Sequence, residues 1–400
     1  MGRPTLTNEV PERGPRRFRV LATSACFEPG FRGGGTIRSV AGIVDTVSDL
    51  TDLTLITKDR DLGSSEPYPG LSGRWVRRGR SRVFYLNTRR VSHWLRLARE
   101  IRAVPFDLLY VNSLWEPMFT IVPILAAKVR LIPTKRLLIA PRGELSPGAL
   151  SLKALKKFCF LKLWAPLLRS MNVAWHASAE REASEIRAVI PWAHIVVNHD
   201  PRPLPEDPIP ATALNQGPPR YVFISRISRK KNLALTLRTL TGLSTPVQFD
   251  IYGTLEDTRY WAECEALIRR MPGHVRVAYH GELLPDAVRV TFSRYDAFLF
   301  PTLGENFGHV IAESLSASCP VLCSDQTPWT SVLEAGGGFV VRELTSEALG
   351  RELERLAALS PEERCRARQA AGSAYSSWRE ATVDRNVLED VRIGEWPASS

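Results

Sequence analysis

The sequence predicts an α/β protein made of two Rossmann-like, doubly wound domains. Its 400 residues exceed what a single hydrophobic core usually serves. Short β-branched runs alternate with amphipathic stretches in two separate series, the pattern of parallel sheets that carry helices on both faces. Between the series, DPRPLPEDPIPATALNQGPP contains seven prolines and cannot form regular structure.

The strands of both series can be placed in order along the chain. The first series comprises RFRVLATS, LTLITK, DLLYVNS, RLLIAPRG, NVAWHAS and HIVVNHD, and the second comprises YVFISRIS, VQFDIYG, VRVAYHG, DAFLFP and PVLCSD. We therefore expect one domain over 1–200, a proline-rich linker over 201–218, and a second domain over 219–380. The last stretch, over 381–400, is helical in pattern.

Composition and charge narrow the class of protein. Apolar residues make up 44% and charged residues 24%, which is typical of a globular protein. Lys and Arg number 53 against 42 Asp and Glu, so the surface should attract phosphorylated substrates, anionic lipid or nucleic acid. The six cysteines form no CxxC pair, and the polar start lacks the apolar core of a signal peptide. We expect a cytoplasmic protein.

The segment FLFPTLGENFGHVIAES carries the strongest chemical signal. It predicts a strand, a tight glycine-containing loop and a helix that begins near Asn306. Helix N-termini stabilise phosphate, so the amides aimed at the cleft would be those of Phe307, Gly308 and His309. Glu305 precedes this helix and Glu313 lies two turns into it, where each carboxylate can accept hydrogen bonds from vicinal hydroxyls. Taken alone, a Glu near a helix start commonly only stabilises the helix dipole, and a Glu two turns into a helix is commonly a solvated surface side chain.

GENFGHVIAES resembles glycosyltransferase family 4, which has two Glu separated by seven residues and FG just after the first. The resemblance implies a GT-B fold whose N-terminal domain faces the acceptor, whose second domain binds a nucleotide sugar, and whose last helix crosses back. It further implies that Glu305 contacts the donor sugar, that Glu313 contacts the nucleotide ribose, and that Asn306 lines the donor site.

A second match is YVFISRISRKKNL. Arg226 and Lys231 flank a strand-to-helix turn, which would bring two cations to the mouth of the cleft. Alone, SRKK is typical of a solvated basic loop. In the family, this Arg and Lys clamp the donor diphosphate and offset charge on the leaving nucleotide. The chain has Asn232 where the family commonly has Gly, a mild departure because Asn also tolerates turn conformations.

Three glycines complete the predicted donor site. The glycines of CFEPGFRGGGTIRSV permit close approach of the backbone to a ligand. The family resemblance implies that Gly34 and Gly35 reach the donor phosphates or the acceptor. A dinucleotide is a weaker alternative, because LTLITKD presents Lys58 where an acidic residue would hold a nicotinamide ribose. Gly253 ends the strand VQFDIYG and is expected beside the donor.

The family's sugar-facing His has no direct counterpart. Many members carry it after the fourth or fifth strand of the first domain, where APRGELSPGAL presents Arg142. We assign Arg142 to a sugar or phosphate contact, with a buried structural Arg as the alternative. His176, at the end of the next strand, is a possible substitute, although a core His is the commoner explanation.

A metal and an organic cofactor are not expected. Asp59 and Asp61 in KDRD superficially match the Asp-x-Asp signature by which other sugar transferases hold manganese. Two Rossmann-like units, however, indicate the two-domain class of sugar transferases, in which helix dipoles and cations stabilise the negative charge on the leaving group without a metal. The histidines form no HxxxH pair.

The segment SLKALKKFCFLKLWAPLL, over 151–168, interleaves basic with apolar residues. The lysines are Lys153, Lys156, Lys157 and Lys162. This pattern suits a helix on an anionic membrane surface, and an ordinary domain helix explains it nearly as well. No nucleic-acid motif accompanies it.

Together these features predict a retaining glycosyltransferase that moves a sugar from a nucleotide-diphosphate sugar to a glycan or lipid-linked acceptor in cell-surface polysaccharide synthesis. Peripheral attachment to an anionic membrane is part of the expectation. A sugar-nucleotide epimerase or hydrolase on the same fold, and a non-catalytic nucleotide-binding or nucleic-acid-binding protein, are the alternatives.

Overall fold

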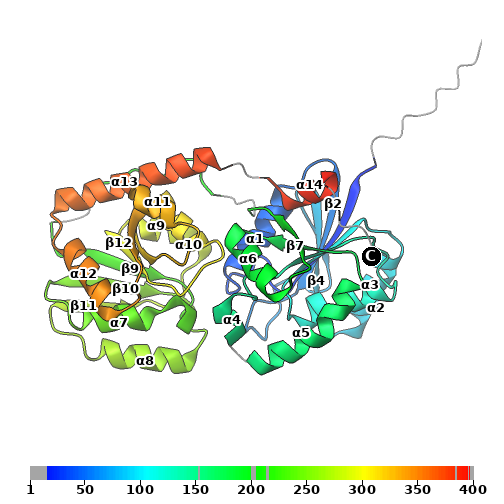
Figure 1. Cartoon of the computed structure of the whole chain (residues 1–400), viewed down its shortest axis with the longest axis horizontal. Helices are drawn as coiled ribbons and strands as arrows, with labels where there is room; N and C mark the ends of the chain where they lie inside the picture. The colour runs from blue at the N-terminus through cyan, green and yellow to red at the C-terminus, as the bar shows by residue number, and fades with distance from the viewer. Residues whose placement is uncertain are drawn as a thin grey trace, which may run out of the picture.

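The computed structural model describes residues 16–151, 154–199, 204–212, 216–382, 385–394 and 396. Two α/β domains lie side by side, each a twisted sheet with helices on its faces (Figure 1). An eight-stranded sheet forms the N-terminal domain and a six-stranded sheet the C-terminal domain. The predicted α/β class with two Rossmann-like units is confirmed.

The N-terminal sheet has the strand order β3-β4-β2-β1-β5-β6-β7-β8. Its strands are β1 Phe18–Ser24, β2 Thr51–Lys58, β3 Trp75–Arg78, β4 Ser81–Leu86, β5 Leu108–Asn112, β6 Leu137–Ala140, β7 Val173–Ala177 and β8 His194–Val197. All neighbours pair in parallel except β3 and β4, which form an antiparallel hairpin at one edge. Sequence analysis did not predict this hairpin.

The C-terminal sheet is entirely parallel, in the order β11-β10-β9-β12-β13-β14. Its strands are β9 Arg220–Ile224, β10 Val247–Tyr252, β11 Val275–Tyr279, β12 Ala297–Phe300, β13 Val321–Ser324 and β14 Gly338–Val341. The central strands β9, β12 and β13 carry nearly continuous buried apolar runs, as parallel strands covered on both faces do. In β10 and β11, buried residues alternate with less buried ones.

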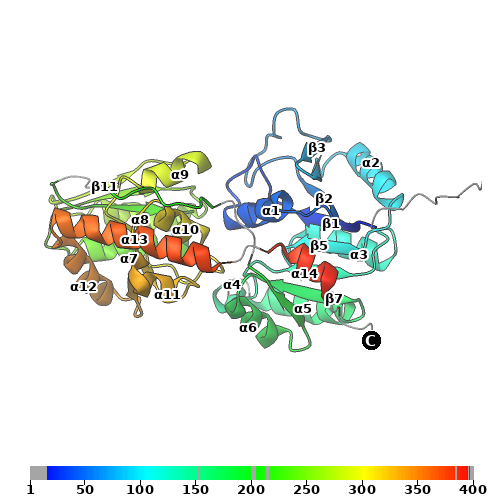
Figure 2. The same cartoon turned by 90° about the horizontal axis from the view of Figure 1, so that it is seen from above.

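Helices cover both sheets (Figure 2). In the N-terminal half they are α1 Gly35–Asp45, α2 Val91–Arg102, α3 Val122–Lys128, α4 Pro147–Ser151, α5 Ala154–Arg169 and α6 Glu180–Val189. The C-terminal half has α7 Leu233–Leu240, α8 Thr258–Ile268, α9 Pro285–Phe292, α10 His309–Ser316, α11 Thr330–Val332, α12 Ser346–Ala357, α13 Pro361–Ala381 and α14 Val387–Ile393. No described helix is long and apolar enough to cross a membrane.

The described part of the proline-rich stretch, 204–212, is irregular but packs against the C-terminal domain. The amide of Ile209 donates to the carbonyl of Ser316 over 2.8 Å, and the Oγ of Ser318 donates to the carbonyl of Ile209 over 2.6 Å. Arg368, buried in α13, donates to the carbonyl of Thr212. Its Pro content keeps this segment extended, so backbone carbonyls that no helix or sheet uses are free to accept these bonds.

The chain crosses back at its end. Helix α13 lies along the C-terminal domain, and α14 lies on the N-terminal domain (Figure 1). Val387, Leu388 and Val391 of α14 join the core that covers one face of the eight-stranded sheet. Asn386 donates from Nδ2 to the carbonyl of Ile43 over 2.8 Å, which fixes the start of α14 against α1. The last described elements thereby tie the two domains together.

Candidate functional site

A cleft of about 560 Å³ lies between the two domains. The loop after β1 and the start of α1 form one wall, while the turn after β9, the end of β10 and the loop before α10 form the other. Parallel α/β sheets place their ligands at the carboxyl ends of strands, where these loops are. The residues predicted to be catalytic or to bind the donor line this cleft: Gly34, Gly35, Arg142, Arg226, Lys231, Gly253, Glu305, Asn306, Phe307, Gly308, His309 and Glu313.

Lys231 and Glu305 form an ion pair at the floor of the cleft. The Nζ of Lys231 lies 2.6 Å from Oε1 of Glu305, and the side chains are 10% and 11% exposed. The Oγ1 of Thr302 donates to the same oxygen over 2.9 Å. Burial alone would raise the pKa of Glu305, but the ammonium groups of Lys231 and Lys230 outweigh it and hold that pKa below its ordinary value. Glu305 is therefore a carboxylate at neutral pH.

A short turn carries Lys231 into the cleft. Residues Arg229–Lys231 form a single 3₁₀ turn after β9, and Asn232 follows in the left-handed region at φ 57°. The Nδ2 of Asn232 donates to the carbonyl of Pro301 over 3.0 Å, so the turn is tied to the end of β12. Asn suits both tasks, since it tolerates positive φ and offers a side-chain donor.

Arg226 lies at the junction of the domains. Its Nη1 pairs with Oε2 of Glu256 over 2.9 Å, and its Nε lies against Gly34 of the opposite domain. Gly34 has φ 61°, and a Cβ there would come within 3.4 Å of that Nε. Loss of water around the Lys230 ammonium lowers its pKa, and the charges of Lys231 and Arg226 lower it further. Three cationic side chains, Arg226, Lys230 and Lys231, therefore line this part of the cleft, and carboxylates pair with Arg226 and Lys231.

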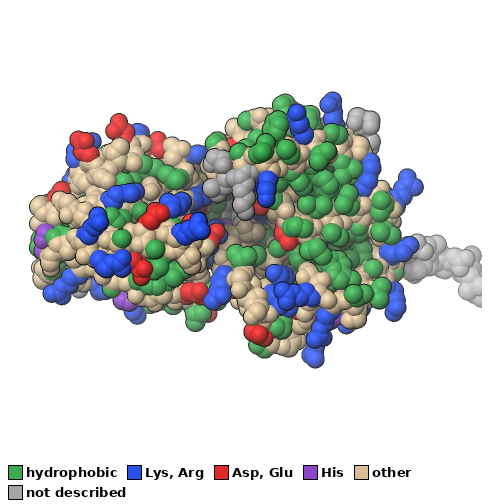
Figure 3. All heavy atoms as spheres, turned by 90° about the horizontal axis from the view of Figure 1, so that it is seen from below, with side chains coloured by type: hydrophobic (Ala, Val, Ile, Leu, Met, Phe, Trp, Pro, Cys, Tyr) green, Lys and Arg blue, Asp and Glu red, His purple; other side chains and the backbone are tan. Residues whose placement is uncertain are grey.

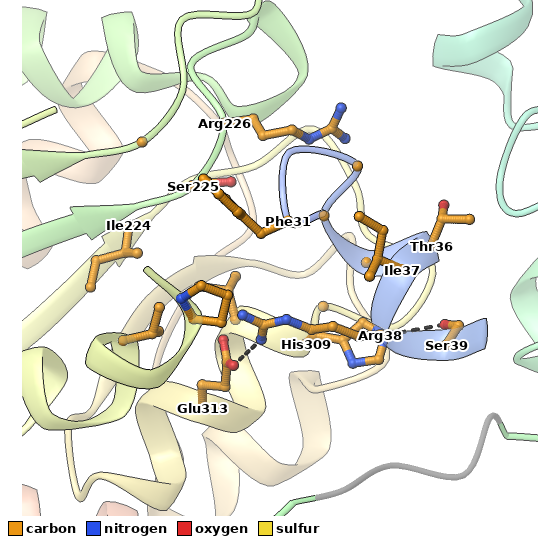
Figure 4. A pocket seen from close by; sticks show the side chains of 18 of the residues that line it. Phe31, Thr36, Ile37, Arg38, Ser39, Ile224, Ser225, Arg226, His309 and Glu313 are labelled. Atoms are coloured by element: carbon orange, nitrogen blue, oxygen red, sulfur yellow. Dashed lines mark hydrogen bonds and ion pairs between the residues drawn. The ribbon is translucent and has the colours of Figure 1, made fainter. Parts of the chain in front are cut away.

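Glu313 faces the N-terminal domain across the cleft (Figure 4). Its Oε1 pairs with Nη1 of Arg38 from α1, and beside this pair the Oγ of Ser39 lies 3.2 Å from Nε2 of His309. The Oε2 of Glu313 is buried and has no hydrogen-bond partner among the described residues. A buried carboxylate oxygen without a donor is costly, so this atom is positioned to accept a ligand hydroxyl.

Helix α10 begins at His309, three residues later than expected from the sequence. Gly308 has φ 84°, which L side chains rarely adopt, so the backbone cannot enter the helix before it. Asn306 and Phe307 consequently belong to the same loop as Glu305 rather than to the first turn of the helix. The loop still places all of them on the cleft wall.

Arg142 reaches the cleft from the loop after β6, with φ 54°. Its Nη2 donates to Oδ1 of Asn112 and to the hydroxyl of Tyr110, each over 2.8 Å. That hydroxyl also lies 2.8 Å from Nδ1 of His176, whose Nε2 lies 2.9 Å from the carbonyl of Asn198. His176 is buried beneath Arg142 and does not line the cleft, so the possibility that it faces the sugar is wrong.

Gly253 lines the cleft at a position where only a glycine fits. A Cβ at this position would lie 1.7 Å from the carbonyl oxygen of Ser225, and its φ is 148°. The end of β10 can approach the turn after β9 this closely only without a side chain. Gly253 thereby allows Ser225 and Arg226 to line the cleft.

The C-terminal domain matches a known protein family. Residues 206–373 match the family model described as glycosyl transferases group 1. The protein is a glycosyltransferase. Comparison of the glycosyltransferase sequence with curated proteins finds no match.

Solved structures of similar fold cover almost the whole glycosyltransferase chain. Sucrose-phosphate synthase from Thermosynechococcus elongatus aligns with TM-score 0.69 at 14% identity, covering 94% of this chain and 98% of that one. Anabaena HepE in complex with UDP-glucose aligns with TM-score 0.64 at 14% identity over 94% and 100%. WaaG, a glycosyltransferase involved in lipopolysaccharide biosynthesis, aligns with TM-score 0.62 at 13% identity over 94% and 100%. At these identities the likeness establishes the GT-B fold.

Three residues that no sequence pattern singles out join the glycosyltransferase domains at the cleft: Arg38, Ser39 and Glu182. Glu182 is 3% exposed, and its Oε1 accepts from the amide of Gly143 over 2.7 Å and from Nδ2 of Asn306 over 2.9 Å. In the sequence it is merely an acidic residue in the first turn of a helix, which ordinarily serves the helix dipole. In the folded protein it joins loops of its own domain and, through Asn306, also contacts the other domain.

Asp61 supports the loop after β1, whereas Asp59 is held within the segment that follows β2. Asp59 is fully buried, and its carboxylate accepts from Nε of Arg60 over 2.9 Å and from Oγ of Ser72 over 2.6 Å. The Oδ2 of Asp61 accepts from the amide of Phe31 over 3.0 Å. Within the described residues, no group of three or more His, Cys, Asp or Glu is arranged to hold a metal ion.

Proposed function

We propose that the protein is a retaining glycosyltransferase of family 4 that moves a sugar from a nucleoside diphosphate sugar to an acceptor hydroxyl. The supporting observation is the convergence, in one cleft between two Rossmann-like domains, of the Lys231–Glu305 ion pair, Arg226 and the unpartnered Oε2 of Glu313. HepE, of the same fold, was crystallised with UDP and with UDP-glucose.

Each part of the donor has a group of matching chemistry in the cleft. Arg226 and Lys231 carry the positive charge that a diphosphate requires, and charge-assisted hydrogen bonds to phosphate are strong. Glu313 offers Oε2 to the hydroxyls of the ribose. Glu305, held as a carboxylate by Lys231, accepts from hydroxyls of the transferred sugar.

The reaction requires no covalent bond to the protein. The acceptor oxygen bonds to the anomeric carbon on the face that the leaving group departs from, while the bond from that carbon to the β-phosphate oxygen breaks. The acceptor proton passes to the departing phosphate, and nucleoside diphosphate is released. Lys231 and Arg226 meet the negative charge that grows on the phosphate, and this lowers the barrier more than it strengthens ground-state binding.

A panel of nucleoside diphosphate sugars tests the proposal. We expect one donor to raise the thermal midpoint and, with an acceptor, to yield a glycoside whose proton NMR spectrum shows the anomeric configuration of the donor. Isomerised or hydrolysed donor without a glycoside would indicate an epimerase or hydrolase. Binding without turnover of any donor would indicate a non-catalytic nucleotide-binding protein.

We further propose that the acceptor is a lipid-linked or growing glycan at an anionic membrane surface. On α5, Leu155 and Leu163 are 77% and 81% exposed, while Trp164 and Leu168 of the same helix are buried in the core. Figure 3 shows hydrophobic side chains gathered over the N-terminal domain, with Lys and Arg side chains around them. Exposed apolar side chains beside lysines suit a membrane interface.

Sedimentation with vesicles tests the membrane proposal. The protein should pellet with phosphatidylglycerol vesicles at low salt and be released as salt shortens the Debye length from about 10 Å at 0.1 M to about 3 Å at 1 M. Leu155→Ser with Leu163→Ser should reduce pelleting, whereas Val290→Ser, an exposed position of the other domain, should not. Equal recovery of all variants on the vesicles would exclude α5 as the attachment site.

A further inference from the structure

A second basic cavity lies in the N-terminal domain, away from the donor cleft. It has a volume of about 570 Å³, and five arginines line it: Arg17, Arg19, Arg77, Arg80 and Arg82. Among its lining residues Asp52 is the only one with a carboxylate. The cavity therefore carries a large excess of positive charge.

The cavity lies at the start of the strands, whereas the donor cleft lies at their ends. Arg19 is the second residue of β1 and Arg82 the second residue of β4. Figure 2 shows α1 facing the C-terminal domain, while β1 enters from the opposite side. None of the cavity residues lines the donor cleft.

The register of the sheet gathers these side chains on one face. Arg77 of β3 pairs directly with Arg82 of β4, Arg82 with Thr54 of β2, and Arg19 of β1 with Asp52 of β2. Residues in register across a sheet point to the same side, so a row of arginines crosses the sheet. Further along the strands, this face carries the apolar core instead.

The arginines are only partly neutralised. Arg17 pairs with Asp52 over 3.2 Å, and Arg80 pairs with Asp49 outside the cavity. Arg19, Arg77 and Arg82 form no ion pair with any carboxylate of the described residues. Like charges directly opposite on an antiparallel pair destabilise it, so the Arg77–Arg82 pair gains most from a bound anion.

One arginine is already positioned for binding. The Nε of Arg82 donates to Oγ1 of Thr54 over 3.0 Å, and its guanidinium lies 4.7 Å from the ring centroid of Trp75. Stacking on Trp75 and the hydrogen bond from Nε hold the Arg82 guanidinium in place, which leaves its terminal NH₂ groups for a ligand. Planar guanidinium groups match two oxygens of a phosphate.

We propose that this arginine cavity binds a ligand carrying two or more phosphate groups, at a site separate from the donor cleft. Charge on several phosphates matches several converging arginines, and the volume exceeds the needs of a single small anion. The proposal does not rest on the identity of the glycosyl donor, because no residue is shared between the two sites.

Inorganic tripolyphosphate is the probe, titrated by calorimetry into the wild-type protein and three variants. Arg77→Ala with Arg82→Ala should weaken binding at this site by about tenfold or more, since it removes two charge-assisted contacts. Arg99→Ala with Arg102→Ala removes the same charge from exposed positions of α2, and should change affinity less than about twofold. Lys231→Ala, in the donor cleft, should leave the arginine site intact.

A second arm distinguishes the source of the phosphates. Binding to vesicles that contain phosphatidylinositol bisphosphate is compared with binding to tripolyphosphate in solution, which shows whether the site prefers a lipid headgroup or a soluble ligand. Loss of binding to either ligand in the Arg77→Ala, Arg82→Ala variant supports the site. Equal weakening by the two double variants would show only a diffuse basic surface and overturn the proposal. So would the absence of tripolyphosphate binding to the wild-type protein. Unchanged thermal midpoints establish that all variants are folded.

Discussion

Glu182 and Asn306 belong to different domains, and the Nδ2 of Asn306 donates to Oε1 of Glu182 over 2.9 Å. The same carboxylate accepts from the amide of Gly143 and, through Oε2, from the amide and hydroxyl of Ser178. One buried acid thus joins the loop that carries Arg142 to the loop that carries Glu305. This contact joins the two halves of the cleft together with the Arg38–Glu313, Arg32–Glu282 and Arg181–Gln326 contacts.

A double-mutant cycle measures that coupling. Glu182→Gln should lower the free energy of unfolding by about 1–3 kcal/mol, because it puts an amide donor where N–H groups already point. Asn306→Ala should lower the free energy of unfolding by a smaller amount. The decrease in the double variant should be smaller than the sum of the decreases in the two single variants, as expected for residues in contact. Urea unfolding provides the values. Strict additivity would show that the domains do not depend on this bond.

The ribose assignment predicts coupling between Glu313 and the ligand. Glu313→Gln should weaken a nucleoside diphosphate that binds the wild-type protein, since a charged acceptor contributes about 1.5–3 kcal/mol. Replacing the nucleoside diphosphate by its 2′-deoxy or 3′-deoxy analogue should reduce the binding affinity less for the variant than for the wild type. Calorimetry measures both. The assignment fails if the variant and the wild type discriminate equally between ribose and deoxyribose ligands.

The Lys231–Glu305 pair predicts a pH dependence of stability. Because the pKa of Glu305 is held below its ordinary value of 4.5, the pair's contribution is fully present above that pH. It is lost as pH falls through the lower pKa of the folded state. The stability difference between wild type and Glu305→Gln should therefore be constant from neutral pH to about 4.5 and shrink below it.

Urea unfolding between pH 7 and pH 3 provides the measurement for this pair. Glu347→Gln is the matched control, because the Glu347 side chain is 84% exposed and its ion pair with Arg351 is solvated. That variant should track the wild type throughout. A difference between wild type and Glu305→Gln that persists unchanged at pH 3 would contradict the low pKa.

Local patterns were sufficient to predict the parallel strands and the motif positions. Strand-turn-helix units have characteristic sequences, so Glu305, Lys231 and Gly34 could be assigned to loops at strand ends. The β3–β4 hairpin escaped prediction because WVRR and SRVFYL flank a Gly-Arg turn with arginines, which breaks the apolar alternation. The hydrophobic pattern places the start of α10 too early because the left-handed backbone conformation of Gly308 leaves no mark in hydrophobic periodicity.

Contacts between domains could not be predicted from the sequence. Arg38 follows a glycine-rich loop and resembles any surface arginine, yet it pairs with Glu313, 275 positions later in the chain. His176 ends a strand as a catalytic residue often does, but Tyr110 and Asn198 satisfy its ring inside the core. Such outcomes depend on packing between distant segments, which a periodic pattern does not encode.

The most direct test compares Lys231→Ala with Arg229→Ala. Both residues belong to SRKK, but Lys231 lines the cleft whereas Arg229 points away and pairs with Glu263. If Lys231 meets charge on the leaving phosphate, its truncation should raise the barrier to transfer by about 2–4 kcal/mol, seen mainly in kcat, while Arg229→Ala keeps near-normal turnover. Equal, near-normal turnover in both variants, with unchanged binding of nucleoside diphosphate, would place the donor site elsewhere.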